Sequence, residues 1–330
     1  MKIEENAIID NSLGIESRCK ILATLQSIND LDNIKDLINT HKKYYIQGEG
    51  TNIVPPAFYD GLILKLEIDH IRKNADTLSV GASHNWTELV KFCINEKING
   101  FENLIDIPGS VGASPIQNIG AYGADVSKLI ESIDYFCLDT FAMKSLTNKE
   151  CNFLYRDSAI KNSHYLIHNI NFKSNLEKNI SYKYSSVQKY MDDNSISADN
   201  LTLKDISKII SRIRSNVLPD PNIIYNAGSF FKNPIIDKNL ISFNDFNEDQ
   251  LIIWEYSDNL VKVGAARLIE LIRDKLEPSK NVSIYKNHSL VLITNGEATQ
   301  EEVLSFASQI KQLVYKSFNV VLDIEPNVIT

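Results

Sequence analysis

The spacing of apolar and polar positions predicts helices over residues 31–43, 86–96, 203–213, 265–273 and 300–318. In the first of them, Leu31, Ile34 and Leu37 lie at helical intervals. In the last, Thr299 with Glu302 supplies a capping box, which marks the start of a helix. These stretches are spread over the whole chain and do not form a single block.

Short apolar runs predict strands over residues 44–47, 62–68, 77–81, 130–138, 164–172, 290–294 and 319–324. Strands and helices do not alternate in the even rhythm of a doubly wound fold, so we expect a mixed α+β fold. Residues 173–200 are polar and poor in glycine, and they predict a linker or a mobile loop. Residues 218–221, Leu-Pro-Asp-Pro, predict a domain boundary.

Bulk properties place the chain among globular proteins. Its 330 residues suffice for two or three domains, and 43% hydrophobic with 23% charged residues is ordinary. The net charge of -8 gives no bias toward nucleic acid or anionic membranes. We find neither a signal peptide nor an apolar run of membrane-span length. Four widely spaced cysteines predict free thiols in a reducing compartment and neither disulfides nor a zinc site.

The most distinctive stretch is residues 107–123, Ile-Pro-Gly-Ser-Val-Gly-Ala-Ser-Pro-Ile-Gln-Asn-Ile-Gly-Ala-Tyr-Gly. It holds four of the thirteen glycines of the chain, and small residues fill much of the remainder. Glycine permits positive φ and leaves no side chain to keep a ligand away. The composition fits an ordinary loop with two turns or a backbone surface for a flat or charged ligand.

A second glycine-bearing turn, Gly48-Glu49-Gly50-Thr51-Asn52, follows the strand predicted at 44–47. Such a turn can present backbone N–H groups to a pyrophosphate. Position 53 is isoleucine, so the turn is not a full G-x-G-x-x-G, and a Rossmann fold is disfavoured. Together with residues 107–123, it predicts a dinucleotide that lies between two glycine-rich loops.

Three other positions carry side chains suited to charge or proton chemistry. Arg156 is a forked, permanently charged donor that suits a carboxylate or enolate oxygen, the alternative being a surface pair with Asp157. Ser229, in the run 226–234, could donate a proton with cationic or dipolar help, although most serines are structural. Glu325 is either solvated near the chain end or carried into a core by the strand predicted before it.

Several segments resemble, in order, the UDP-N-acetylenolpyruvoylglucosamine reductase family. They are residues 11–14 (Asn-Ser-Leu-Gly), 48–52, 100–104 (Gly-Phe-Glu-Asn-Leu), 107–123, 155–158, 218–221, 226–234 and 325–326. The resemblance spans nearly the whole chain, and 107–123 and 226–234 are its most specific strings. The stretch 181–190 resembles the type I branch, whose loop tyrosine closes over the nucleotide substrate. Tyr184 is our choice for that tyrosine, with Tyr182 and Tyr190 as alternatives.

The resemblance implies an α+β fold with an FAD-binding domain of the vanillyl-alcohol-oxidase (PCMH) type in two lobes, plus an α+β substrate-binding domain. We expect lobe 1 at residues 1–66 and lobe 2 at 67–215, with the tyrosine loop near 181–190. The substrate domain is then 216–330, and its C-terminal segment returns to the active site. The FAD contacts implied are Gly48, Glu49, Gly50, Thr51, Asn52, Pro108, Gly109, Ser110, Gly112, Ala113, Ser114, Gln117, Asn118, Ile119 and Gly123.

The resemblance also implies an activity: NADPH reduces FAD, which then reduces UDP-N-acetyl-3-O-(1-carboxyvinyl)-glucosamine to UDP-N-acetylmuramate in peptidoglycan precursor synthesis. Hydride from flavin N5 reaches the vinyl carbon, and negative charge develops on the carboxylate. Arg156 then faces that carboxylate, Glu325 lies beside it, either protonated or sharing a proton, and Ser229 is the proton donor. The substrate-binding residues expected are Tyr155, Tyr184, Lys232, Asn233, Lys262 and His288, and no metal is expected.

The chain departs from the family pattern at several positions. Val217 stands where members carry a lysine near the substrate diphosphate, so Lys232 or Lys262 would have to serve instead. Tyr225 stands where a glycine is common. Arg267 and Glu270 replace a tryptophan and an aspartate, and the tail lacks a second glutamate and a longer extension. These changes touch substrate affinity and leave Arg156, Ser229 and Glu325 in place.

Two other functions compete with this hypothesis: an FAD oxidase of the same fold with another substrate, and a flavin- or nucleotide-binding protein without turnover. The run 226–234 and Glu325 argue against the oxidase, which needs neither. The partners expected are a UDP-sugar and NADPH, without nucleic acid or membrane insertion. We further expect a monomer in the cytoplasm.

Overall fold

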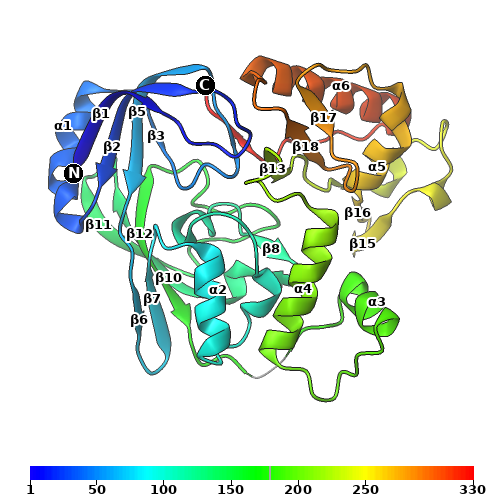
Figure 1. Cartoon of the computed structure of the whole chain (residues 1–330), viewed down its shortest axis with the longest axis horizontal. Helices are drawn as coiled ribbons and strands as arrows, with labels where there is room; N and C mark the ends of the chain where they lie inside the picture. Colours follow the sequence, from blue (N-terminus) through cyan, green and yellow to red (C-terminus); the bar gives the residue numbers. More distant parts are fainter. Residues whose placement is uncertain (178–179) are drawn as a thin grey trace. The chain divides into compact units, whose positions relative to one another are not determined.

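The computed structural model describes residues 1–177 and 180–330 (Figure 1). Internal contacts divide the chain into two compact units. Unit 1 comprises Met1–Ala7, Cys19–Glu49 and Asp60–Ser215, and unit 2 comprises Ile8–Arg18, Gly50–Tyr59 and Asn216–Thr330. The division into parts 1–66, 67–215 and 216–330 stays a prediction, because compactness does not show which ligand a part binds.

A four-stranded sheet in order β1-β2-β5-β3 forms the N-terminal part of the fold. Its strands are β1 (Lys2–Ile8), β2 (Arg18–Leu25), β3 (Tyr44–Ile46) and β5 (Phe58–Leu66). The connection from β2 to β3 contains the 3-10 helix η1 (Ile28–Asn33) and α1 (Ile34–Thr40). Leu25, Ile34 and Leu62 are fully buried in the cluster that this connection shares with the sheet, which explains why so short a helix is stable.

The second sheet of unit 1 is antiparallel, in order β11-β10-β12-β7-β6. Its strands are β6 (Ile71–Lys73), β7 (Thr77–Gly81), β10 (Ile130–Cys137), β11 (Ala142–Thr147) and β12 (Tyr165–Lys173). The helices of unit 1 that follow β7 are α2 (Trp86–Asn95), α3 (Ser185–Asp193) and α4 (Leu203–Val217, which ends in unit 2), with the 3-10 turns η2 (Glu102–Leu104), η3 (Val111–Ala113) and η4 (Val126–Lys128). α2, α4 and the sheet share one apolar core.

Three aromatic side chains lie at the centre of this core. The rings of Trp86, Phe101 and Phe172 are within 5.4 to 6.2 Å of one another, and each residue is at most 1% exposed. The Trp86 indole also donates to the Leu104 carbonyl at 2.8 Å. The segment before residue 107 is thus tied to α2, so the glycine-rich run starts from a fixed point.

Unit 2 has three small sheets and two helices. The sheets are β13-β18-β17, β14-β16-β15 and the parallel pair β19-β4. Their elements, with the intervening turns and helices, are β4 (Ile53–Val54), β13 (Asn226–Ser229), β14 (Ile235–Asp237), η5 (Lys238–Leu240), η6 (Glu248–Gln250), β15 (Ile253–Ser257), β16 (Leu260–Val263), α5 (Ala265–Ile272), η7 (Arg273–Lys275), β17 (Val282–Ile284), β18 (Val291–Thr294), α6 (Gln300–Phe318) and β19 (Asn327–Val328).

The structure confirms the α+β fold and most predicted elements. The capping box of α6 is present, with Thr299 accepting from the Glu302 amide, and Asn319 ends the helix in the left-handed region at φ 56°. Two predictions were wrong. Residues 173–200 are not merely a linker, because Val187 and Met191, one turn apart, are buried and support α3. Residues 319–324 form no regular strand, since only Ile324 makes an isolated bridge, to Phe231.

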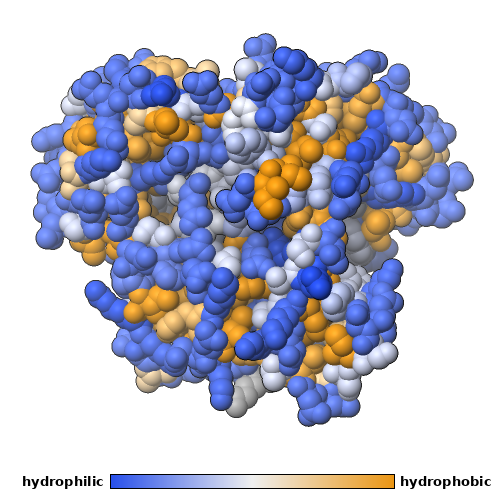
Figure 2. Space-filling view, in the orientation of Figure 1, coloured by the Kyte–Doolittle hydropathy of each residue, from blue (hydrophilic) through white to orange (hydrophobic). Residues whose placement is uncertain are grey.

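Two bulk expectations can be compared with the structure. Cys19, Cys93, Cys137 and Cys151 are all free and buried. Within residues 1–177 and 180–330, no helix is long and apolar enough to cross a membrane. Figure 2 shows polar and apolar residues interspersed on the face that it draws.

Candidate functional site

The glycine-rich run 107–123 is anchored at its start by close backbone packing. Gly109 has φ 122° and Asp106 has φ 58°, so the chain turns sharply on both sides of Pro108. Further along, Gly112 donates to the Ala82 carbonyl at 2.8 Å, and a Cβ on Gly112 would lie only 2.7 Å from the Ala82 Cβ. Glycine is needed here for close packing against the end of β7.

The run ends in a two-residue hairpin. β8 (Gly120–Ala121) pairs antiparallel with β9 (Ala124–Asp125), and the turn residues Tyr122 and Gly123 have φ 48° and 80°. Two positive φ values are typical of the primed turns that connect tight hairpins. Glycine adopts that backbone freely, whereas a tyrosine must be held there by its surroundings.

Asn118 holds the middle of the run through both atoms of its carboxamide. Its Nδ2 donates to the Leu154 carbonyl at 3.0 Å, and its Oδ1 accepts from the Ser127 amide at 3.1 Å. The residue is 6% exposed and has φ 44°, which asparagine tolerates better than most residues. Asn118 thus joins the run to the segment bearing Arg156, and the FAD contact expected of it stays a prediction.

Arg156 lies against the glycine-rich run. Its Nη2 donates to the Gly120 carbonyl at 2.6 Å and its Nη1 to the Asn118 carbonyl at 3.3 Å. A Cβ on Gly120 would collide first with Asp125 Oδ1 in the hairpin and would also lie 3.0 Å from Arg156 Nη1, so glycine leaves room for both. The guanidinium is also 5.5 Å from the centre of the Tyr155 ring. The orientation of this cation is therefore set by the run, and the sequence alone did not show that connection.

The turn that starts at Gly48 approaches the same run. A Cβ on Gly48 would lie 2.9 Å from Ser110 Oγ and 3.6 Å from the Ala113 Cβ. Within residues 1–177 and 180–330, the consecutive amides of Gly48, Glu49 and Gly50 donate no hydrogen bond to another residue. The Glu49 carboxylate accepts from Asn85 Nδ2 at 3.2 Å. Gly48 and Glu49 belong to unit 1, while Gly50, Thr51 and Asn52 belong to unit 2.

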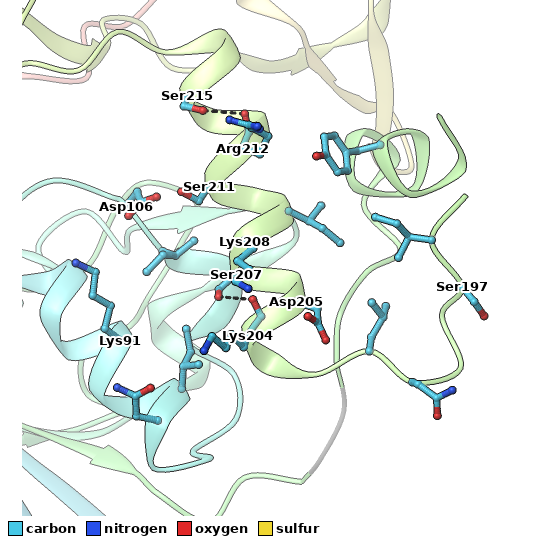
Figure 3. A pocket seen from close by; sticks show the side chains of 18 residues that line it. Lys91, Asp106, Ser197, Lys204, Asp205, Ser207, Lys208, Ser211, Arg212 and Ser215 are labelled. Carbon is cyan, nitrogen blue, oxygen red and sulfur yellow. Dashed lines mark hydrogen bonds between the residues drawn. The ribbon is translucent and has the colours of Figure 1, made fainter. Parts of the chain in front are cut away.

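The three candidate tyrosines have different surroundings. Tyr184 is 45% exposed, and its ring meets that of Tyr122 edge-on, 5.5 Å between centroids at 76°. Tyr182 packs against the core of unit 1. Tyr190 lines a groove of about 970 Å³ between α2, α4 and residues 196–201 (Figure 3). The choice of Tyr184 stays a prediction.

The groove in Figure 3 contains none of the catalytic or cofactor-binding candidates. Lys204, Lys208 and Arg212 follow one another along α4 there, and Ser207 and Ser215 donate to carbonyls of the same helix, each at 3.0 Å. Its size therefore says little about the chemistry of the protein.

In unit 2, Ser229 ends the strand β13. The strand pairs with β18, with Ser229 opposite Val291 and a register shift after Asn226. The Asn226 Oδ1 accepts from the Gly228 amide at 2.9 Å. Gly228 has φ 68°, and a Cβ added to it would meet nothing within 4 Å. The backbone before Ser229 is thus bent around a buried asparagine and faces open space.

The C-terminal segment pairs with the residues after Ser229. The Glu325 amide donates to the Phe230 carbonyl at 2.9 Å, and the Lys232 amide donates to the Asp323 carbonyl at 3.0 Å. Next, β19 lies parallel to β4, and the Asn327 amide donates to the Asn52 carbonyl at 3.0 Å. Gln300 Nε2 donates to the carbonyls of both Val54 and Ile329, at 2.7 and 2.8 Å. Half-buried Glu325 is therefore adjacent to the segment that carries Ser229.

Ser12 connects two of these segments. Its amide donates to the Gly50 carbonyl at 3.1 Å, its hydroxyl to the Thr51 carbonyl at 3.2 Å, and its own carbonyl accepts from the Asn226 amide at 2.8 Å. In unit 2 it thus joins the glycine-bearing turn to β13. Residues 11–14 contributed only a resemblance in the sequence, and no periodicity could have revealed this role.

The remaining substrate-binding candidates lie in unit 2, and their side chains already have contacts there. Asn233 Oδ1 accepts from the Ala265 amide at 3.0 Å and so serves the start of α5. Lys262 is 5.6 Å from the Trp254 ring. His288 Nδ1 accepts from the Leu290 amide at 3.2 Å, and burial lowers the pKa of the imidazole. Leu290 in turn accepts from the Phe230 amide, so the turn at His288 is tied to the strand of Ser229.

Three of the residues that depart from the family pattern have contacts in the structure. Arg267 Nη1 and Glu270 Oε2 form an ion pair of 2.9 Å, so the two replacing residues contact each other. The Tyr225 ring lies over Gly14 and Gly296, where added Cβ atoms would lie 2.7 and 2.8 Å from it. Nothing in the structure explains why Val217 lacks the positive charge expected there.

Comparisons with known proteins agree with this architecture. Residues 19–136 match a family model described as an FAD binding domain, so the class is that of proteins with an FAD-binding α+β domain. Residues 219–329 match the model of the C-terminal domain of UDP-N-acetylenolpyruvoylglucosamine reductase.

Two relatives carry that reductase name: one from Flavobacterium johnsoniae is 32% identical and one from Amoebophilus asiaticus 33% identical, each over 100% of both chains. A UDP-N-acetylenolpyruvylglucosamine reductase structure from Thermus caldophilus has a similar fold, with a TM-score of 0.70, 18% identity and 100% coverage of both chains. The chain belongs to the UDP-N-acetylenolpyruvoylglucosamine reductase family.

Proposed function

We propose that this protein is an FAD-dependent, NADPH-oxidising reductase that converts UDP-N-acetyl-3-O-(1-carboxyvinyl)-glucosamine to UDP-N-acetylmuramate in peptidoglycan synthesis. One observation carries the proposal: in a chain similar to such reductases over its whole length, main-chain pairing sets Glu325 next to the strand that bears Ser229. An oxidase of the same fold needs neither Ser229 nor Glu325 for its chemistry.

The residues of the glycine-bearing turns fit FAD. Successive backbone N–H groups at Gly48, Glu49 and Gly50 suit a pyrophosphate, which carries negative charge and many acceptor oxygens. Ser114 Oγ is buried and has no hydrogen-bond partner among the residues that the structure describes, so a ligand atom could satisfy it. These features support a cofactor held by residues 48–52 and 107–123, with Asn118 and Gly112 shaping the loop.

FAD, when bound, supplies the hydride chemistry that protein side chains lack. Addition of hydride to the vinyl group leaves negative charge on the substrate carboxylate, and a preorganised cation stabilises that charge best. We assign this task to Arg156, whose guanidinium is already oriented by the carbonyls of Gly120 and Asn118.

The carbon that bears the ether oxygen must receive a proton. We assign the donor to the Ser229 hydroxyl, and we assign Glu325 to the substrate carboxylate. Tyr155, Tyr184, Lys232, Asn233, Lys262 and His288 are proposed to bind the UDP-sugar. Lys232 or Lys262 then replaces the cation that is absent at Val217.

We extend the proposal to the domains, the oligomeric state and the location of the protein. Residues 1–66 and 67–215 form the two FAD-binding lobes and 216–330 the substrate-binding domain. The protein acts as a monomer, in the cytoplasm, and binds neither nucleic acid nor membrane. The net charge of -8 supports the absence of a nucleic-acid partner.

The test is the visible flavin spectrum of the protein without oxygen. We expect NADPH to bleach the oxidised bands and the enolpyruvyl-UDP-sugar to restore them with formation of one product. Flavin that is reduced but not reoxidised by the sugar would reject the substrate and leave the same-fold oxidase or another flavoenzyme. A colourless protein that cannot be loaded with FAD would reject the flavoenzyme altogether.

A further inference from the structure

Tyr122, at the tip of the hairpin, is contacted by three residues that are far apart in the sequence. Asn103 Nδ2 donates to the Tyr122 carbonyl at 2.9 Å. The charge of Arg214, in the last turn of α4, acts on the Tyr122 phenol and opposes the rise of its pKa on burial. The ring of Tyr184 meets the Tyr122 ring edge-on at 5.5 Å. All four residues belong to unit 1.

Asn103 also holds the segment that leads to Tyr184. The same Nδ2 donates to the Ser181 carbonyl at 2.9 Å. Asn103 is only 1% exposed, so water does not easily replace either bond. One carboxamide nitrogen thus joins the hairpin tip to the chain three residues before Tyr184, and the two rings continue the contact.

Arg214 fixes the other side of the hairpin tip. Its Nη2 donates to the Asp106 carbonyl at 3.0 Å, and Asp106 lies at the sharp turn that precedes the glycine-rich run. Burial raises the pKa of the Tyr122 phenol, and the Arg214 charge offsets only part of that rise, so the phenol stays neutral. Asn103 therefore restrains the main chain of Tyr122, which has φ 48°, and Arg214 lies beside its side chain.

Tyr184 itself is at the boundary between the docked segment and α3. Its carbonyl accepts from the Val187 amide at 2.9 Å, and Val187 is fully buried. The helix side of Tyr184 is thus anchored by apolar packing, whereas the side toward Ser181 depends on Asn103. Of the two, the Asn103 contact is the one that a single polar substitution can remove.

We propose that Asn103, with Tyr122 and Arg214, is a positioning element that seats Tyr184 on the hairpin tip of the glycine-rich run. The consequence for substrate binding rests on the proposed function, in which Tyr184 contacts the UDP-sugar. The docking of the segment is a property of the protein alone and can be measured without substrate. Neither Asn103 nor Arg214 is a catalytic residue in this proposal.

The test replaces Asn103 by aspartate, which keeps the shape but turns a donor toward two carbonyl oxygens into an acceptor. We expect hydrogen exchange of the amides of residues 181–187 to become about tenfold faster, as loss of a buried hydrogen bond requires. Asn148→Asp is the matched control, because Asn148 Nδ2 also donates to two carbonyls, those of Ser127 and Ile130, at 2.6 and 2.8 Å. It should leave exchange at 181–187 within about twofold of the original protein.

Kinetic measurements distinguish the loss of the Tyr184 position from a general loss of enzyme function. In Asn103→Asp we expect KM for the UDP-sugar to rise about tenfold while the rate of flavin reduction by NADPH changes less than about twofold. Unchanged exchange at 181–187 in a folded Asn103→Asp protein would overturn the proposal. Faster exchange with an unchanged KM would keep the docking but overturn its role in substrate binding.

A second variant covers failure of Asn103→Asp to fold. Tyr122→Leu removes the ring and the phenol but keeps the carbonyl that Asn103 binds. We expect faster exchange confined to residues 184–187, since the ring contact is lost and the bond to Ser181 persists. Unchanged exchange in this variant would overturn the proposal that the Tyr122 ring holds Tyr184 on the hairpin tip. If the UDP-sugar is not turned over at all, the proposed function fails while both exchange experiments still test the docking.

Discussion

In unit 1, main-chain bonds hold the start of the glycine-rich run 107–123, but its middle is held by the side-chain amide of Asn118, which bonds to main-chain groups. In unit 2, main-chain bonds hold the strand that ends at Ser229 and the residues after it, and they come from Ser12, from β18 and from the segment around Glu325. Asn118 joins the run to Leu154 and Ser127, whereas Phe230 and Lys232 bond directly to the segment around Glu325. The first arrangement depends on particular side chains, and the second depends on the path of the chain.

This difference predicts how each site responds to substitution. A side chain that holds a loop cannot be removed without loosening the loop, because its buried partners lose their hydrogen bonds. A side chain carried on main-chain pairing can be removed with little change in its surroundings. Substitutions at the site in unit 2 should therefore change the reaction rate without changing stability, whereas substitutions at the site in unit 1 should change both.

The largest effect is expected from Ser229→Ala. Loss of a positioned proton donor should lower the rate of product formation about 1,000-fold. Because β13 is held by main-chain bonds and by Asn226, the melting temperature and the rate of flavin reduction by NADPH should not change measurably. Rapid-reaction absorbance follows both flavin steps. Ser283→Ala, at an exposed position of β17, is the control.

Product formation at the original rate in Ser229→Ala would refute the proton-donor role. A large fall in the melting temperature would instead contradict the comparison, because it would show that the serine side chain supports the strand. The control should match the original protein in all three measurements.

Two amide side chains provide the next test, one from each unit. Asn118→Leu removes a donor and an acceptor and places leucine at φ 44°, so we expect a loss of about 3 kcal/mol in the free energy of unfolding. Gln300→Leu should cost only about 1 kcal/mol. Its acceptor at Val54 keeps a bond from the Ile329 amide at 3.1 Å, so main-chain pairing persists.

Urea unfolding measures both variants. Trp86 is 1% exposed in unit 1, so in a Trp254→Phe background tryptophan fluorescence reports the unit that contains Asn118. Far-ultraviolet circular dichroism follows the whole chain. Equal losses in the two variants would show that the sites do not differ in the way proposed here.

Glycines give a smaller effect with an internal reference. Gly14 and Gly228 have nearly equal φ, 65° and 68°, but an added Cβ meets the Tyr225 ring at 2.7 Å on Gly14 and nothing within 4 Å on Gly228. Gly14→Ala should cost about 2 kcal/mol and Gly228→Ala about 1 kcal/mol, since only the first displaces a ring.

A double-mutant cycle isolates the ring contribution. In a Tyr225→Ala background, the cost of Gly14→Ala should fall to that of Gly228→Ala, because only the backbone term remains. An undiminished cost would mean that the contact with Tyr225 is not what excludes a side chain at Gly14.

The same comparison shows how far the sequence leads. Residues 107–123 form one contiguous run of small residues, so their composition pointed directly to a ligand-binding loop. Most helices and strands were also predictable, because periodicity and the capping box at Thr299 are local. The helix α3 was not predicted because its two buried residues, Val187 and Met191, are surrounded by polar residues in the sequence.

The arrangement around Glu325 could not be predicted from local pattern. Residues 319–324 were expected to be a strand, but Val320 and Leu322 are buried without regular pairing. The residues that follow this segment bond to Asn52, Val54 and Phe230, which lie between 95 and 275 positions away in the sequence. No local sequence pattern around these three residues predicts the contact. Ser12, Asn103 and Gln300 were missed for the same reason, since their roles lie in which distant carbonyls they reach.

The smallest expected effect concerns the carboxyl beside Asn103. Burial raises the pKa of Glu102 above its ordinary value of 4.5, although its carboxylate accepts from the Gly100 amide at 2.7 Å. The folded chain therefore holds this proton more tightly than the unfolded chain, so the residue lowers stability as pH rises from 4.5 through the folded pKa. Glu102→Gln, which does not titrate, should gain stability relative to the original protein over that interval and then stay level.

Glu150→Gln is the control of opposite sign in the same unit. Hydrogen bonds from Thr147 lower the pKa of Glu150, so its contribution to stability is lost as pH falls below 4.5. Relative to the original protein, Glu150→Gln should lose stability as pH rises toward 4.5. Urea unfolding between about pH 3 and about pH 8 measures both differences. If the two differences in unfolding free energy changed with the same sign, burial of Glu102 would not be the cause. Buried polar side chains would then contribute less to the stability of unit 1 than the contacts of Asn103 and Asn118 indicate.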